Sequence, residues 1–297
     1  MKVGLIGLGI MGKPMAKNLL AKGTELYVYD IAENPILELE ELGAKRALPA
    51  DMGEAVDILL TILPNGEVVK QSLFGSEGAA QRLRSGSIVV DMSSVTPTDS
   101  RYCWERLQEG GVDFLDAPVS GGEPKAIAGT LAFMVGGDEE AFQRALPTLM
   151  QMGANAVLVG PSGSGSVTKL ANQIIVNLNI AALGEALVFA AKAGVDPEKV
   201  FAAIGGGLAG SAVMEAKAPM IMERNFKPGG KISVNHKDIK NVVDTAHALD
   251  IPIPMSAQLF EIMQGLKVQG LMDEDHGAIV KHFEALAATE VHKGGRQ

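Results

Sequence analysis

The sequence predicts an α/β domain in its first half, an all-α domain in its second half and a long helix that joins the two. In the first half, short apolar runs rich in β-forming residues alternate with helical stretches. This alternation is typical of a parallel sheet with helices on both faces. The pattern changes at a glycine-rich break in residues 160–165, after which we find helical periodicity and no convincing strand. A chain of 297 residues has room for two such domains, at about 150 residues each.

The expected strands are short, and the early ones are apolar throughout, as strands buried on both faces tend to be. Helices between them are expected over residues 11–21, 34–42 and 97–109. The strands are expected over residues 3–6, 26–29, 58–62, 88–91, 114–116, 131–135 and 156–159.

The connecting helix is expected over residues 169–193, because apolar side chains recur there at helical spacing. At about 1.5 Å per residue, such a helix can cross from one domain to the next. We therefore expect an α/β domain over residues 1–161, the connecting helix within 162–193, and an all-helical domain over 194–297. The helices of the last domain are expected over residues 198–204, 213–223, 236–249, 255–266 and 277–287.

Composition and charge argue against several classes of function. With 26 Lys and Arg against 35 Asp and Glu, the net charge is −9, whereas a nucleic-acid surface needs clustered basic residues. The single cysteine, Cys103, forms neither a disulfide framework nor a thiolate metal site, so we expect no metal and a reducing cytoplasm. We find no uncharged apolar run of about 18 residues, so we expect no membrane span, and the N-terminus indicates a strand and a helix, not a signal sequence.

Six residues after the first expected strand match a dinucleotide-binding fingerprint. Gly7 would make a tight turn, Gly9 would let the backbone approach a pyrophosphate, and Gly12 would let helix and strand pack closely. The alternative is an ordinary glycine turn, since the chain has 35 glycines. The position between a strand and a helix favours a Rossmann-type NAD-binding domain. The candidate cofactor-binding residues of this loop are Gly7, Leu8, Gly9, Ile10, Met11 and Gly12.

Asp30 ends the second expected strand, near the spacing of an acid that binds the adenosine ribose. Its carboxylate would accept hydrogen bonds from both ribose hydroxyls and would repel a 2′-phosphate. Ile31 and Ala32 follow, with no Arg to hold that phosphate. The sequence therefore favours NAD over NADP.

Two further segments follow expected strands on the cofactor side. Leu63 and Pro64 come after the third long strand, and Thr96 comes after the fourth. Ligands of doubly wound folds bind outside the carboxyl ends of the strands, so these residues are placed to touch the cofactor. Taken alone, each segment also fits an ordinary turn and helix cap.

The chemical site is expected in two other places. Ser120, Gly121 and Gly122 follow a strand, and their backbone N–H groups suit a carboxylate, although a tight turn has the same composition. Lys169 lies at the expected start of the long helix, and Asn172 and Gln173 share its face. A lysine there opposes the helix dipole, which hints at function. The alternative is a solvated surface lysine.

Four segments occur in the order seen in β-hydroxyacid dehydrogenases, and the chain resembles this family over essentially its whole length. The segments are the glycine fingerprint, residues 116–122, residues 160–169 with their spaced glycines and Lys169, and the pair Lys237 and Asp238. Residues 116–126 and 206–211 are similar in particular to the subgroup that reduces tartronate semialdehyde.

The resemblance implies Lys169 as the catalytic residue and Ser120, Gly121 and Gly122 as the loop that holds the substrate carboxylate. It implies Asn172 near the reacting oxygen, and Lys237 as a residue that approaches the cofactor or the substrate from the second domain. The chain departs from several relatives, which have Asn four residues after the lysine, where this chain has Gln173. Which of the two amides meets the substrate stays open.

The activity that the resemblance implies is the reversible, NADH-dependent reduction of tartronate semialdehyde to glycerate, with a proton from Lys169. Oxidation of 3-hydroxyisobutyrate, or reduction of glyoxylate or succinic semialdehyde, is the alternative within the family. A non-enzymatic module that senses NAD is the alternative of a different class, and Lys169 weighs against it. The expected partner is a small anionic aldehyde or hydroxy acid. A homo-oligomer is also expected, because relatives are commonly dimers or tetramers.

Overall fold

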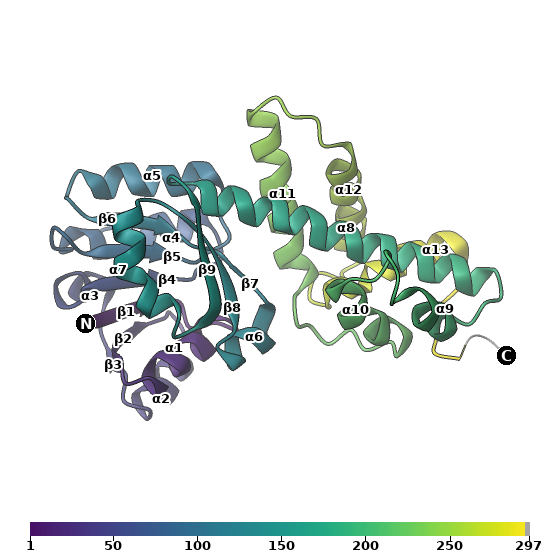
Figure 1. Ribbon diagram of the computed structural model, residues 1–297, viewed down its shortest axis with the longest axis horizontal. Helices are drawn as coiled ribbons and strands as arrows, with labels where there is room; N and C mark the ends of the chain where they lie inside the picture. The colour runs from purple at the N-terminus through teal and green to yellow at the C-terminus, as the bar shows by residue number, and fades with distance from the viewer. Residues whose placement is uncertain (295–297) are drawn as a thin grey trace. The chain divides into compact units, whose positions relative to one another are not determined.

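The computed structural model describes residues 1–294, and its first part is built on one nine-stranded sheet (Figure 1). The strand order is β3-β2-β1-β4-β5-β6-β8-β7, and β9 pairs with β8. The strands are β1 (Lys2–Ile6), β2 (Glu25–Tyr29), β3 (Lys45–Arg46), β4 (Ile58–Thr61), β5 (Ile88–Asp91), β6 (Asp113–Asp116), β7 (Val119–Ser120), β8 (Leu131–Gly136) and β9 (Gly153–Gly160).

The expected parallel sheet is confirmed from β3 to β6, and the sheet departs from it after β6. All pairs from β3 to β6 are parallel, in the strand order of a dinucleotide-binding fold. The order in which successive strands are added to the sheet reverses between β1 and β4. β8 is antiparallel to β6 and β7, while β9 is parallel to β8. Apolar periodicity is the same in either direction, so the sequence did not reveal this reversal.

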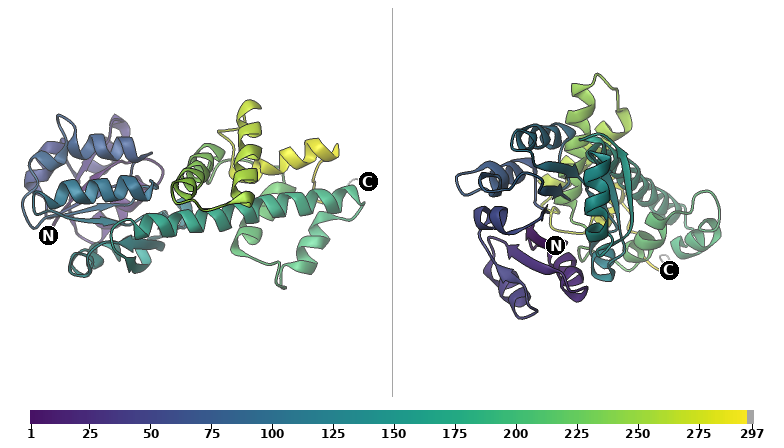
Figure 2. Two further views of the ribbon diagram at one scale, coloured as in Figure 1. Left: turned by 90° about the horizontal axis from the view of Figure 1, so that it is seen from above. Right: turned by 60° about the vertical axis from the view of Figure 1, so that its left-hand side comes forward.

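Helices cover both faces of this sheet (Figures 1 and 2), and each face has its own core. One core combines the strands with side chains of α1 and α7, such as Leu19 and Phe142. The other combines them with side chains of α3, α4 and α5, such as Met52, Val69 and Leu107. The helices are α1 (Gly12–Ala21), α2 (Glu33–Glu40), α3 (Pro49–Ala55), α4 (Gly66–Phe74), α5 (Pro97–Gln108), α6 (Gly122–Ala128) and α7 (Glu139–Leu149).

The chain divides into two units, Met1–Lys169 and Leu170–Gln297. The division falls inside α8 (Ser164–Lys192), which starts five residues before the expected position. Lys169 therefore lies in the second turn, and the dipole penalty expected for a first-turn lysine is smaller, because this effect fades beyond the first turn. The three-part division at residues 161 and 193 stays a prediction.

Unit 2 is mostly helical, as expected. Its helices pack around two apolar clusters, which include Ile239 and Leu266 in one and Leu187 and Ile221 in the other. Among the described residues of unit 2, Lys231 and Asp275 form an isolated antiparallel β-bridge. The helices after α8 are α9 (Pro197–Ile204), α10 (Ala212–Met222), α11 (Ile232–Ala248), α12 (Pro254–Val268), the 3-10 helix η2 (His276–Ile279) and α13 (Val280–Ala287).

Helix α8 is long and apolar enough to cross a membrane by length and composition, and Glu185 interrupts its uncharged apolar run. Core helices of soluble proteins meet the same criterion. The side chains of Gln173 and Asn177 on α8 are buried and hydrogen-bonded within unit 2. Amides placed inside a protein core indicate a core helix, because lipid offers them no partner.

Candidate active site

The glycine loop between β1 and α1 has room for a ligand at one glycine and none at the other two. A Cβ on Gly7, whose φ is +100°, would meet Ile62 O at 2.3 Å, and a Cβ on Gly12 would meet Gly7 O at 1.9 Å. A Cβ on Gly9 would meet no atom within 4 Å. Gly7 and Gly12 thus allow turn and packing, while Gly9 borders open space beside the start of α1. This arrangement fits a pyrophosphate.

The N-terminus of α1 carries no competing anion. No side chain caps it, and its first turn has no acidic residue. Leu8 is buried and its N–H donates to the carboxylate of Asp30, whereas Ile10 is exposed and Met11 is partly buried. Backbone N–H groups at such a helix start attract phosphate oxygens.

Asp30 lies beside the glycine loop at the end of β2, and the backbone fixes its carboxylate. Oδ2 accepts a hydrogen bond from Leu8 N at 2.6 Å, and Oδ1 accepts one from Ala32 N at 2.8 Å. Each carboxylate oxygen has a second lone pair, so these bonds orient the group and leave it able to accept hydroxyl donors.

The segments after β4 and β5 are tied to each other and to helix starts. Leu63 N donates to Ser93 Oγ at 2.8 Å, and Pro64 follows it. Thr96 Oγ1 accepts from Asp99 N at 3.1 Å and donates to Asp99 Oδ2 at 2.6 Å, so it caps α5. The helix-cap reading of Thr96 is thus observed, and a cofactor contact by Leu63, Pro64 or Thr96 stays a prediction.

Ser120, Gly121 and Gly122 form the turn between β7 and α6. Gly121 and Gly122 have φ values of +137° and +65°, which L side chains rarely adopt. A Cβ on Gly121 would also meet the side chain of Lys125 at 2.7 Å. The three residues are partly or fully exposed, so their backbone is open to a small anion.

The structure brings Lys169 beside this turn. Its Nζ donates a hydrogen bond to the backbone oxygen of Val119 at 2.8 Å, and Val119 immediately precedes Ser120. Both belong to unit 1. Lys169 is partly buried, so the alternative of a fully solvated surface lysine does not describe it.

Asp116 is a buried acid of this region to which the sequence analysis gave no role. It is 1% exposed, and its oxygens accept hydrogen bonds from Gly163 N at 2.8 Å and Ser166 N at 2.7 Å. Burial raises the pKa of Asp116 to about 6, although the two backbone hydrogen bonds oppose this shift. Its place at the end of a strand, before the loop residues, was the signal that could have found it.

Unit 2 holds a chain of polar contacts that joins the two other predicted residues. Asn172 Nδ2 donates to Gln173 Oε1 at 2.9 Å, and Gln173 Nε2 donates to Asp238 Oδ2 at 2.6 Å. Lys237 Nζ lies 3.1 Å from Asp238 Oδ1. Gln173 is buried and Asn172 is partly exposed. Of the two amides, Asn172 is therefore the one better placed to meet a ligand, and its contact with a substrate stays a prediction.

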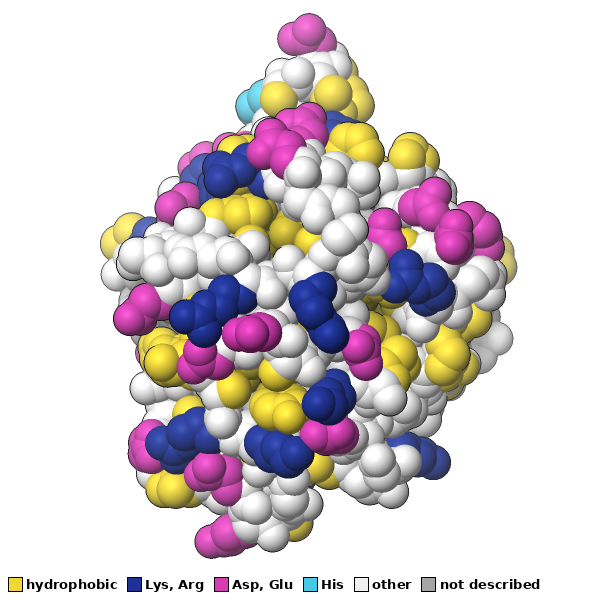
Figure 3. Space-filling model, turned by 90° about the vertical axis from the view of Figure 1, so that its left-hand side faces the viewer, with side chains coloured by type: hydrophobic (Ala, Val, Ile, Leu, Met, Phe, Trp, Pro, Cys, Tyr) yellow, Lys and Arg dark blue, Asp and Glu magenta, His cyan; other side chains and the backbone are white. Residues whose placement is uncertain are grey.

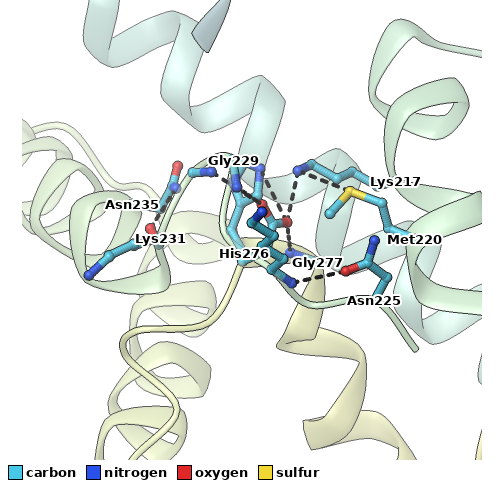
Figure 4. A network of polar contacts seen from close by, with 11 residues as sticks. Lys217, Met220, Asn225, Gly229, Lys231, Asn235, His276 and Gly277 are labelled. Carbon is cyan, nitrogen blue, oxygen red and sulfur yellow. Dashed lines mark hydrogen bonds and ion pairs between the residues drawn. The ribbon is translucent and has the colours of Figure 1, made fainter. Parts of the chain in front are cut away.

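A second buried acid in unit 2 organises the backbone around η2 (Figure 4). Asp275 accepts from Lys217 Nζ at 2.8 Å and from the N atoms of Gly229, Gly230 and Gly277 at 2.9, 3.2 and 2.9 Å. Burial raises its pKa, but Lys217 and the backbone donors outweigh this and leave the pKa below its ordinary value. Burial, aided by Lys217, also lowers the pKa of His276 to about 4. The cluster joins three segments and serves the fold.

The other polar features that we considered among residues 1–294 carry no argument for a site. Cys103 is buried, and burial raises the pKa of its thiol to about 12, so it is a core residue and a poor nucleophile. Over residues 1–294, no group of three or more His, Cys, Asp or Glu side chains could hold a metal ion. On the face in Figure 3, acidic and basic side chains are interspersed. Ion pairs such as Arg144 with Asp113 lie on the surface of unit 1.

Fold and site together define a dinucleotide-binding oxidoreductase with a helical second part. A family model for the NAD-binding domain of 6-phosphogluconate dehydrogenase matches residues 2–160. A second model, for the NAD-binding part of NADP-dependent 3-hydroxyisobutyrate dehydrogenase, matches residues 163–283.

Known proteins resemble the chain over nearly its full length. 2-Hydroxy-3-oxopropionate reductase of Escherichia coli (strain K12) is 43% identical, covering 97% of this chain and 98% of that protein. 2-(Hydroxymethyl)glutarate dehydrogenase of Eubacterium barkeri is 37% identical, covering 99% and 98%. The structure of Mycobacterium tuberculosis 3-hydroxyisobutyrate dehydrogenase with L-serine superposes with a TM-score of 0.87 at 29% identity, covering 94% and 98%. The chain belongs to the β-hydroxyacid dehydrogenase family and is an enzyme, as the sequence predicted.

Proposed function

We propose that this enzyme reduces tartronate semialdehyde reversibly to glycerate, with NADH as the reductant and Lys169 as the proton donor. The observation that carries the proposal is the position of the Lys169 ammonium, 2.8 Å from Val119 O and therefore beside the Ser120–Gly122 turn. The 43% identity to 2-hydroxy-3-oxopropionate reductase supports the choice of substrate.

The chemistry needs one hydride and one proton. A nicotinamide cofactor held by the glycine loop and Asp30 would supply the hydride for the aldehyde carbon. Negative charge then grows on the carbonyl oxygen, where Lys169 as an ammonium stabilises it and transfers a proton to give the alcohol. In the reverse direction, neutral Lys169 accepts the hydroxyl proton.

Backbone and side-chain donors would orient the substrate. Ser120, Gly121 and Gly122 would hold the substrate carboxylate through their N–H groups and the Ser120 hydroxyl, which leaves the aldehyde end for Lys169. Asn172 would meet the reacting oxygen, and Lys237 would contact the cofactor or the substrate. These roles follow from the family resemblance.

For the cofactor, we propose NAD over NADP. Asp30 is held by two backbone N–H groups with its carboxylate beside the glycine loop. A fixed negative charge there accepts the two ribose hydroxyls and repels a 2′-phosphate. We further propose a homo-oligomeric, cytoplasmic enzyme.

The test compares NADH oxidation with tartronate semialdehyde, methylmalonate semialdehyde, succinic semialdehyde and glyoxylate. We expect the highest kcat/KM with tartronate semialdehyde. A higher value with another aldehyde would replace the substrate and keep the enzyme class. NADH binding without turnover of any of them would favour a cofactor-sensing protein.

A further inference from the structure

The first turn of α8 is held by a carboxylate that belongs to a different element. The first N–H groups of a helix have no partner within the helix and need acceptors from outside. Asp116, at the end of β6, accepts from Gly163 N and Ser166 N, while Ser164 N donates to Pro161 O at 3.0 Å. Asp116 thus acts for α8 as a capping side chain does, but from the sheet.

The contacts around this turn leave little freedom for movement. A Cβ on Gly165 would lie 2.3 Å from Asp116 O and 2.3 Å from Met134 O, so α8 meets β6 and β8 backbone to backbone. The buried hydroxyls of Ser166 and Ser100 lie 2.9 Å apart and tie the turn to α5. The start of α8 therefore has a defined position on the sheet.

We propose that Asp116 is a positioning residue, which holds the first turn of α8 against β6 and thereby sets the Lys169 ammonium beside the Ser120–Gly122 turn. Lys169 follows Ser166 by three residues, which is nearly one helical turn, so a shift of the first turn carries the lysine with it. The Ser120–Gly122 turn is close to Asp116 in sequence, because Val119, which accepts a hydrogen bond from Lys169, follows Asp116 by three residues. The inference rests on the proposed role of Lys169.

The choice of a buried acid here supports a role beyond ordinary capping. Serine or asparagine caps a helix without a buried charge. A carboxylate at 1% exposure is an unfavourable way to satisfy two N–H groups, since burial disfavours its charged form. Its two oxygens, however, reach donors three residues apart and fix the turn at both.

The test compares Asp116→Asn and Gly165→Ala with Asp113→Asn, a control on the same strand whose side chain forms a surface ion pair with Arg144. The first readout is the rate at which Lys169 is methylated by formaldehyde and borohydride, followed by peptide mass spectrometry. The second is kcat and KM for the best aldehyde acid, with NADH binding as the check of folding.

We expect both test variants to raise the methylation rate of Lys169 several-fold and to lower kcat about 10- to 100-fold, because small displacements of a catalytic group have effects of this size. KM should change less, and Asp113→Asn should match the wild type.

Unchanged methylation and kcat in folded Asp116→Asn would overturn the proposal, as would equal changes at all lysines. If Asp116→Asn does not fold, Gly165→Ala decides by the same criteria. If the wild type reduces no aldehyde, the proposed function fails, and the methylation rates still decide this inference.

Discussion

At the scale of single residues, the acids of this enzyme differ in what surrounds them. Asp30 is partly exposed and is oriented by two backbone N–H groups. Asp116 is buried with two backbone N–H groups, and burial raises its pKa to about 6. Asp275 is buried as well, but it also has the ammonium of Lys217. We therefore propose recognition for Asp30, positioning for Asp116 and a structural role for Asp275, three roles of one side-chain type that differ with its neighbours.

Replacing Asp30 should change cofactor choice. Asp30→Ala removes the acceptor for the ribose hydroxyls and the charge that repels a 2′-phosphate. We expect the Kd for NADH to rise about tenfold, as for the loss of one or two hydrogen bonds to a charged group, and the preference for NADH over NADPH to shrink. Fluorescence titration with both cofactors measures this, with Asp51→Ala on the surface as a control. An unchanged preference would contradict the role of Asp30.

The raised pKa of Asp116 should appear in the pH dependence of stability. The native state holds the carboxyl proton of Asp116 up to about pH 6, whereas the unfolded chain loses it near the ordinary pKa of 3.8. The contribution of Asp116 to stability is therefore complete below pH 3.8 and is lost as the pH rises through 6. The difference between the folded and unfolded pKa values of Asp116 corresponds to about 3 kcal/mol in the free energy of unfolding.

Urea unfolding of wild type and Asp116→Asn between pH 4 and 7 tests this, because asparagine does not titrate. The stability of the wild type relative to the variant should fall by up to about 3 kcal/mol as the pH rises across this interval. A difference that stays constant with pH would show that Asp116 has an ordinary pKa.

At the scale of elements, the sequence predicted the strands that appear in it as short apolar runs. The strands β1, β2, β4 and β5 lie within one residue of the expected positions, because buried parallel strands are short apolar runs. The helices α3, α4, α6 and α7 were not expected. Helices α3 and α6 are short, with 7 residues each. Asn65 and Asp138, which cap α4 and α7, are recognisable signals in the sequence.

The sequence pattern did not predict which side chains pair across elements. The pattern suggested that Lys169, Asn172 and Gln173 share a helix face, but it left open which amide faces a ligand. That depends on Asp238, 65 residues away, which accepts from Gln173 and keeps it buried. In the same way, the contact of Lys169 with Val119 depends on how α8 packs on the sheet.

Two substitutions separate the packing role of Gly12 from the proposed cofactor contact at Gly9. Gly12→Ala forces a Cβ to within 1.9 Å of Gly7 O, so we expect a loss of about 1–3 kcal/mol of stability, as for overpacking. Gly9→Ala meets no protein atom within 4 Å, so stability should be unchanged while NADH binding weakens. Thermal unfolding and NADH titration measure both. Normal NADH binding by Gly9→Ala would show that the cofactor does not approach there.

The Asp275 cluster should be one of the most sensitive points of unit 2. Asp275→Ala leaves Lys217 and three backbone N–H groups without their common acceptor, and breaking a buried ion pair costs about 3–5 kcal/mol. The control is Asp273→Ala, two residues away, whose side chain is 90% exposed and paired with Lys231. Urea unfolding should show a large loss for the first variant and almost none for the second. Equal losses would contradict the structural role of Asp275.

At the scale of the whole molecule, the candidate residues are divided between the two units. Unit 1 contains the glycine loop, Asp30, the Ser120–Gly122 turn and Lys169, which are the groups that we propose for binding the cofactor, binding the substrate carboxylate and transferring the proton. Unit 2 contains Asn172 and Lys237, linked through Gln173 and Asp238. The family resemblance extends over both units, and the motifs that carry it lie in both.

The most direct test of the account is the single-turnover rate of Lys169→Ala with NADH and the aldehyde acid that the wild type reduces fastest. If Lys169 is the proton donor, the rate should fall about 10²- to 10⁴-fold while the Kd for NADH stays within about twofold of the wild type. A near-normal rate would contradict the assignment and move the proton-donor role to another group.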